Sequence, residues 1–92
     1  MRIGGRIFQA MVNSPDPRFV GFLEISLGRT RVRVPVRESE EGLGDQIATF
    51  TADANGGGII LVRDGAPEKE VERAMGIAAR DAAKHFSRKL LN

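Results

Sequence analysis

The sequence predicts an α+β domain: a five-stranded, mainly antiparallel meander, strongly bent or partly closed into a barrel, with one long C-terminal helix packed on it. Three observations predict this class. Residues 18–37 have the pattern of a β-hairpin, residues 46–62 contain two strand-like segments around a glycine-rich turn, and residues 67–91 have a helical pattern. All 92 residues are expected to form a single domain, with the meander over about residues 2–63 and the helix over about residues 67–91.

The first strand is predicted over residues 2–12. Gly4 and Gly5 interrupt its pattern, and we expect a β-bulge or a close approach of another segment there. The strand must end at the turn cluster of residues 13–17, NSPDP, because both prolines restrict the residue that precedes them.

The hairpin over residues 18–37 has a well-defined register. Gly28 and Arg29 are predicted as the centre of a type II′ turn, since glycine at the first position accepts a positive φ without cost. Leu27 then faces Thr30, and one face of the two strands becomes apolar: Gly21, Leu23, Ile25, Val32, Val34 and Val36. The other face is charged: Glu24, Arg31, Arg33 and Arg37, with Ser26. A slip of one residue would bury the arginines, so this register is favoured.

Three more residues, Val20, Phe22 and Pro35, are expected at the far end of the arginine-bearing face. Glu24 and Arg33 face each other across the strands, an ion pair worth roughly 0.2 to 1 kcal/mol. Pro35 lacks an N–H group, so we expect its strand to be an edge strand or to be bulged there.

An acidic segment, ESEEGLGD at residues 38–45, separates the hairpin from the next strand. It lacks the D-x-[DN]-x-[DN]-G pattern of a calcium loop, so a solvated loop is favoured over a metal site. Residues 46–54 are predicted as a strand, and the apolar run of residues 59–62 as an inner strand covered on both faces. The glycine-rich loop between them is interpreted as a hairpin turn built on Asn55 and Gly56, and not as a phosphate cradle, because no helix follows it.

The helix is predicted to begin at Pro67, whose missing N–H group is not needed at the first helical position. Acidic residues crowd its first turns and basic residues its last turns, which favours the helix macrodipole at both ends. One apolar stripe runs along it: Val71, Met75, Ala78, Ala82, Phe86 and Leu90, widened by Ala74, Ala79 and Ala83. The last turn is expected to overhang the sheet.

Composition argues against an enzyme. The chain has no cysteine, which excludes disulfides, thiolate zinc sites and cysteine nucleophiles. The single histidine, His85, lies among basic residues near the helix C-terminus, where a cation is favoured for structural reasons alone. We therefore expect a non-catalytic binding domain that carries no metal and no cofactor.

The charge distribution says more than the net charge of +2. Residues 1–37 hold seven basic and two acidic residues, residues 38–72 hold two and nine, and residues 73–92 hold five and one. Such segregation either steers a charged partner or neutralises itself when the segments fold together. Residues 1–14 contain no apolar run long enough for a signal peptide or a membrane span, so we expect a cytoplasmic protein without a membrane partner.

The first functional hypothesis is that the arginine-bearing face binds a polyanion, most plausibly single-stranded nucleic acid. Alternate residues of a β-strand stand roughly 6.5 Å apart, which is close to the spacing of phosphates in an extended single strand of nucleic acid. The expected contact residues are Arg29, Arg31, Arg33 and Arg37, with Phe22 placed to stack on a base. The eleven arginines against three lysines suit bidentate phosphate contacts, and they equally suit a GC-rich genome. The alternative for this face is a solvated, partly neutralised surface.

The second hypothesis is a protein-interaction module or a homodimer with no nucleic-acid role. Its contacts would come from apolar residues outside the core, namely Val20 at the far end of the hairpin and Phe86, Leu90 and Leu91 at the end of the helix. Salt distinguishes the two hypotheses, because polyanion binding weakens steeply as ionic strength rises whereas an apolar interface does not.

In the order of its elements, an antiparallel meander and then a C-terminal helix, the chain resembles the transcriptional coactivators that bind single-stranded DNA. The segment GGGIILVRDGAPEKEVERAM stands where those proteins pass from the last strand to the helix. The resemblance implies single-stranded DNA as a partner. It transfers no residue, because the chain has no tryptophan or tyrosine at the family's aromatic positions.

Overall fold

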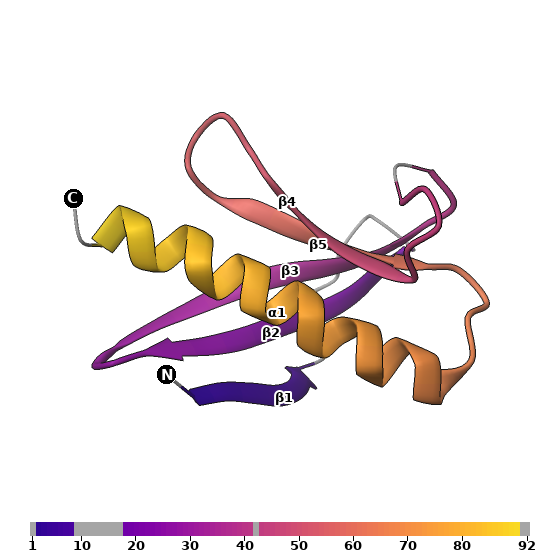
Figure 1. The fold of residues 1–92 in the computed structure, drawn as a ribbon, viewed down its shortest axis with the longest axis horizontal. Helices are drawn as coiled ribbons and strands as arrows, with labels where there is room; N and C mark the ends of the chain where they lie inside the picture. Colours follow the sequence, from indigo (N-terminus) through magenta and orange to yellow (C-terminus); the bar gives the residue numbers. More distant parts are fainter. Residues whose placement is uncertain (1, 9–17, 42, 91–92) are drawn as a thin grey trace.

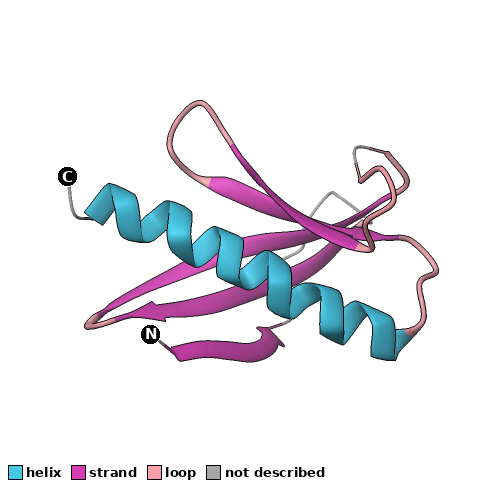
Figure 2. Cartoon of the chain, in the orientation of Figure 1, coloured by secondary structure: helices cyan, strands magenta, loops and turns pink. Residues whose placement is uncertain are grey.

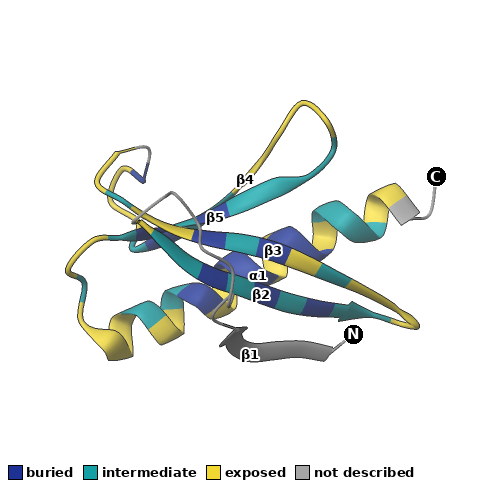
Figure 3. Ribbon diagram, turned by 180° about the vertical axis from the view of Figure 1, so that it is seen from behind, coloured by how far each residue is buried: buried dark blue, intermediate teal, exposed yellow. Residues whose placement is uncertain are grey.

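A computed structural model of the protein describes residues 2–8, 18–41 and 43–90. Along the chain they form β1 (Arg2–Phe8), β2 (Phe19–Leu27), β3 (Thr30–Ser39), β4 (Ala48–Ala52), β5 (Gly58–Arg63) and helix α1 (Glu68–Leu90). The helix lies across one face of a mixed, open sheet (Figures 1 and 2), and the view from behind shows the sheet face that the helix does not cover (Figure 3). The predicted α+β class, with a C-terminal helix on a sheet, is confirmed.

The order of the strands differs from the prediction. The sheet runs β1-β2-β3-β5-β4, and β3 pairs with β5 in parallel, residues 36–39 alongside residues 60–63. The predicted meander and its partial closure into a barrel are therefore wrong. β5 is almost wholly apolar, and it occupies the inner position between β3 and β4, where both of its edges are paired. The shorter β4, which carries two threonines, forms the edge of the sheet.

The β2–β3 hairpin has the predicted register. Leu27 pairs with Thr30, and the pairing continues residue by residue to Gly21 with Val36. Gly28 has a φ of +63°, and no described non-glycine residue has a positive φ, which fits a type II′ turn with glycine at its first position. The register of β1 against β2 shifts between Ile3 and Ile7, where the bulge at the paired glycines was predicted.

A bulge in β2 changes the faces at the far end of this hairpin. The register shifts between Phe19 and Gly21, so Val20 is the extra residue. Val20 packs against the buried cluster. The prediction that it lies on the arginine-bearing face is therefore wrong. The strict alternation assumed from the sequence fails here because a bulge interrupts it.

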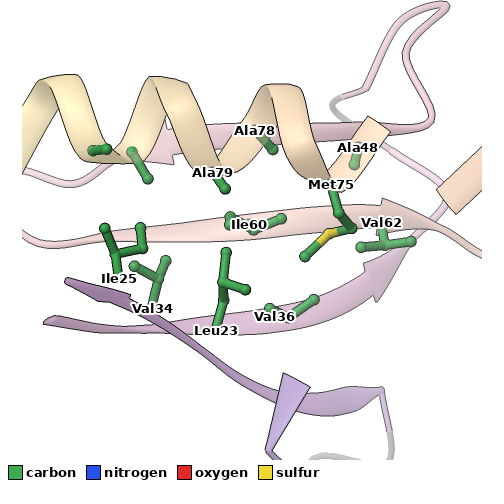
Figure 4. Packing of buried hydrophobic residues seen from close by; sticks show 12 residues of the cluster. Leu23, Ile25, Val34, Val36, Ala48, Ile60, Val62, Met75, Ala78 and Ala79 are labelled. Carbon is green, nitrogen blue, oxygen red and sulfur yellow. The ribbon is translucent and has the colours of Figure 1, made fainter. Parts of the chain in front are cut away.

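The core lies between α1 and the helix-facing side of the sheet. Figure 4 shows Leu23, Ile25, Val34 and Val36 pointing from β2 and β3 toward the helix. Ile60 and Val62 of β5 complete the sheet side, and the helix supplies Met75 and four alanines, Ala78, Ala79, Ala82 and Ala83. Because alanines have short side chains, the helix backbone sits close to the sheet and the strands supply most of the apolar volume.

Pro35 explains why β3 and β5 pair over only a short stretch. The Glu38 N–H donates to the Arg18 carbonyl on the β2 side, while the Ser39 carbonyl accepts from the Asp64 N–H on the β5 side. The backbone N–H and C=O groups of the even-numbered residues of β3 thus point toward β2, and those of the odd-numbered residues point toward β5. The ladder to β5 begins at Val36, directly after Pro35, which has no N–H to give. The expectation of an edge at Pro35 therefore holds for residues 30–35, whereas residues 36–39 form an inner strand.

The remaining connections are held by hydrogen bonds to backbone carbonyls. The Arg63 guanidinium donates to the carbonyls of Gly44 and Gln46, which ties the acidic segment to the end of β5. The Val71 N–H donates to the Pro67 carbonyl and opens the helix. Within the described part of the chain, no helix combines the length and the apolar character that a membrane crossing requires.

The register predicts which side chains support folding. Ile25 is fully buried, so Ile25→Ala is expected to lower the free energy of unfolding by about 2 to 4 kcal/mol. Arg31 has 75% of its side chain exposed, so Arg31→Ser is expected to lower it by less than about 1 kcal/mol. Urea unfolding of both variants tests this. Equal losses would contradict the assignment of the two faces.

Candidate functional site

The arginine-bearing face of the hairpin is the side of the sheet opposite α1. Arg29 lies in the turn, and Arg31, Arg33 and Arg37 alternate along β3, all of them exposed. Their neighbours Val32, Val34 and Val36 point to the other side, where the helix packs. The register that buries the valines thus places Arg31, Arg33 and Arg37 on one open face, with Arg29 in the turn at its end.

Glu24 lies between two of these arginines. Its Oε1 is 3.6 Å from Nη1 of Arg31, and its Oε2 is 3.7 Å from Nε of Arg33. The Glu24 side chain is 22% exposed, whereas the two arginine side chains are 75% and 72% exposed. One carboxylate therefore orients two guanidinium groups and neutralises half of their charge. The pair with Arg33 was predicted, and the contact with Arg31 was missed because Arg31 stands diagonally across the strands.

Two aromatic rings lie at the far end of the hairpin. Phe22, which pairs with Pro35, contacts Phe19 edge-on, with ring centroids 5.1 Å apart and an interplanar angle of 68°. Phe22 is half-buried, so part of its ring is accessible. Phe19 was not predicted as a member of this site, because only the bulge in β2 brings its ring beside Phe22.

The predicted interface residues are dispersed. Val20 packs on the core, and Phe86 contacts the ring of Phe50 from β4, with centroids 5.8 Å apart. A second subunit is therefore not needed to cover Phe86. The side chain of Leu90 and the whole of Leu91 lie outside the described residues, so the interface itself stays a prediction.

The glycine-rich loop is a hairpin turn, as predicted, although the turn closes one residue earlier. The Gly56 N–H donates to the Asp53 carbonyl, and Oδ1 of Asp53 accepts from the N–H groups of Asn55 and Gly57. These amides are already used within the loop and do not form an anion cradle. Gly56 has a φ of +88°, which explains the glycine, and its carbonyl accepts from Lys89 Nζ at 2.8 Å.

His85 belongs to the same corner of the structure. Its Nε2 lies 3.2 Å from the Gly56 carbonyl oxygen and donates to it in the tautomer that carries the proton there. Its ring stacks obliquely on Phe50, with centroids 5.5 Å apart. These contacts give His85 a structural role in joining α1 to the β4–β5 turn.

A pair of carboxyl groups marks the end of β3. A hydrogen bond with the Asp64 carboxyl raises the pKa of Glu38, and partial burial and the charge of Asp64 act in the same direction, while the positive charge of Arg18 opposes them. Glu38 therefore holds its proton to a higher pH than an isolated glutamate does.

No family model, curated protein or solved structure matches the chain. The resemblance to the single-stranded DNA coactivators assumed a meander, and the parallel β3–β5 pairing departs from that topology. The binding partner is therefore inferred below from the geometry and charge of the protein's own surface.

The raised pKa of Glu38 makes stability depend on pH. The folded state holds the Glu38 proton at a higher pH than the unfolded state does, so stability falls as pH rises through that interval. Glu38→Gln, which removes the repulsion, is expected to raise the melting temperature at neutral pH, with little effect at about pH 3, where both states are protonated. Thermal melts at the two pH values check this, with Glu40→Gln as the exposed control. An equal gain at both pH values would contradict the raised pKa of Glu38.

Proposed function

We propose that the protein is a non-catalytic binding domain whose β2–β3 hairpin binds single-stranded nucleic acid through its arginine-bearing face. The observation that carries the proposal is the set of three exposed arginines, Arg31, Arg33 and Arg37, on the sheet face opposite α1, with Arg29 exposed in the adjoining turn. Glu24 is the carboxylate between two of them. A folded domain that places this much positive charge on one open face attracts polyanions.

The spacing of the arginines suits an extended phosphate backbone. Arg31, Arg33 and Arg37 lie at odd positions of one strand, where alternate residues stand roughly 6.5 Å apart. Each guanidinium has five N–H donors, and the contact with Glu24 leaves most of those of Arg31 and Arg33 available. A single strand can therefore follow the hairpin from the turn at Gly28 toward the other end.

The aromatic pair at that other end supports nucleic acid over other polyanions. A base that leaves the backbone near Arg37 meets the partly exposed ring of Phe22, which Phe19 holds in place from the side. Base stacking on an aromatic ring adds roughly 1 to 3 kcal/mol and does not depend on sequence. Heparin or polyphosphate, which have no bases, would gain nothing from these rings.

Binding is expected to depend on salt and on the hairpin arginines. Three or four arginine–phosphate contacts predict a log–log salt slope of roughly −2 to −3, at about −0.7 per phosphate. Fluorescence anisotropy of a labelled single-stranded oligonucleotide at several salt concentrations measures the slope. The double variant Arg31→Glu, Arg33→Glu is expected to abolish binding and to retain its fold, because both side chains are mostly exposed.

The matched control reverses the same amount of charge on the other side of the molecule. Arg80 and Lys84 are exposed on α1, so Arg80→Glu, Lys84→Glu changes the net charge equally without touching the hairpin. Retained binding in this control with lost binding in the hairpin variant supports the proposal. Equal losses in both variants would show that only net charge matters, and no binding at low salt would rule the proposal out.

Glu24 competes with phosphate for the same guanidinium groups. Glu24→Gln removes one negative charge from the face while keeping the shape of the side chain, so affinity for the oligonucleotide is expected to rise by about threefold to tenfold. The same anisotropy titration measures the change. Unchanged affinity would place the bound phosphates away from Arg31 and Arg33.

A further inference from the structure

β4 is an edge strand, and no strand among the described residues pairs with its outer side. The Ile47 carbonyl accepts from the Arg63 N–H, and the Asp53 N–H donates to the Gly57 carbonyl. The backbone N–H and C=O groups of the odd-numbered residues of this segment therefore point toward β5. The N–H and C=O groups of the even-numbered residues, Ala48, Phe50 and Ala52, then point away from the sheet. An added strand would find three donors and three acceptors there.

A groove runs beside this edge, between the start of β4 and the flank of α1. It encloses about 360 Å³. Residues 45–48 line one side, and the other side is a single stripe of the helix: Glu70, Arg73, Ala74, Ile77 and Asp81. Even-numbered residues of β4 also face the helix, since Phe50 contacts Phe86, so an added strand would direct alternate side chains into this groove.

Ile77 gives the groove an apolar centre. Its side chain is 59% exposed, and within the described residues it is the sole large apolar side chain so exposed. It does not belong to the stripe that packs on the sheet, which runs through Met75, Ala78 and Ala82. A strand edge of this kind can pair with a strand of another chain, and Ile77 provides an apolar contact beside it.

The charged residues that line the groove favour a basic binding partner. Three carboxylates line the groove, those of Asp45, Glu70 and Asp81, against the one guanidinium of Arg73. Glu70 and Asp81 lie on either side of Ile77 along the helix, about 10 Å and 6 Å away at 1.5 Å per residue. The matching partner is an extended segment with a central apolar residue and a basic residue two positions before and two positions after it, so that all three side chains lie on one face. The apolar residue then meets Ile77, and the basic residues meet Glu70 and Asp81.

We infer that β4 and α1 form a docking groove for an extended basic segment of a partner protein, which adds as a strand to the edge of β4. Its backbone pairs with Ala48, Phe50 and Ala52, its apolar side chain packs on Ile77 and Ala74, and its flanking lysines or arginines pair with Glu70 and Asp81. This surface differs in charge and position from the arginine-bearing face, and it stands whether or not the protein binds nucleic acid.

A second copy of the chain fits the groove less well than a basic segment. Pairing of two β4 edges across a two-fold axis would bring residues 48–52, ATFTA, of one copy beside the groove of the other. These residues have no basic side chain to pair with Glu70 and Asp81. The free stretch of β3 is a poorer edge for a basic segment, because Arg31 and Arg33 flank it and Pro35 lacks an N–H.

The test uses the full chain and a fluorescein-labelled peptide of sequence TKTVTKT. Its valine and both lysines share one face, and its threonines fall beside Thr49 and Thr51 of β4. We expect saturable binding that weakens with salt, and no binding of TETVTET. Amide shift changes in ¹⁵N spectra are expected at Ala48, Phe50 and Ala52.

Variants in the groove locate the site. Ile77→Ser and Asp81→Lys are each expected to weaken binding of TKTVTKT by about tenfold, and both residues are exposed, so the fold is expected to persist. Glu72→Lys is the matched control, since Glu72 is exposed on the same helix outside the groove.

Four results would overturn the inference: no saturation at low salt, equal binding of both peptides, equal loss in the Glu72 control, or shift changes confined to the hairpin. A dimer in sedimentation equilibrium that Ile77→Ser dissociates would also overturn it, because the occupant would then be a second copy.

Discussion

The pairing register of β2 and β3 is the constraint on which the rest of the structure depends. Because side chains alternate along a strand, one register decides which residues are buried and which are exposed. It places Ile25 and Val34 under the helix, and it places Arg31 and Arg33 on the opposite face with Glu24 between them. The core and the candidate binding face are therefore two consequences of one pairing, and a shift of one residue would remove both.

The sequence was sufficient for features that depend on neighbouring residues. The turn at Gly28, the hairpin register, the amphipathic helix and the turn at Asn55 all follow from local spacing and from glycine positions, and the structure confirms them. The sequence was insufficient where distant segments compete for a position. Nothing local indicates that β5 inserts between β3 and β4, and the bulge that turns Val20 inward has no signature in its residues.

The inner position of β5 and the bulge in β2 also determine the two candidate binding surfaces. Because β5 takes the inner position, β4 becomes an edge beside the flank of α1, and the groove around Ile77 arises from this arrangement. Because β2 is bulged, Phe19 reaches Phe22. The arginines could be placed from sequence, whereas the aromatic pair and the groove required the fold. The protein thus presents a basic face on the β2–β3 hairpin and an acidic groove beside β4, which makes two partners of opposite charge chemically reasonable on one small domain.

The most direct measurement of the central claim is native-state hydrogen exchange along β3. The hairpin register directs the N–H groups of Val32 and Val34 toward β2. Those of Arg31 and Arg33 point to the other side, where no described strand pairs with residues 30–35. We expect slow exchange at the two valines and fast exchange at the two arginines. Protected arginine amides with exchanging valine amides would contradict the register, and with it both the core and the arginine-bearing face.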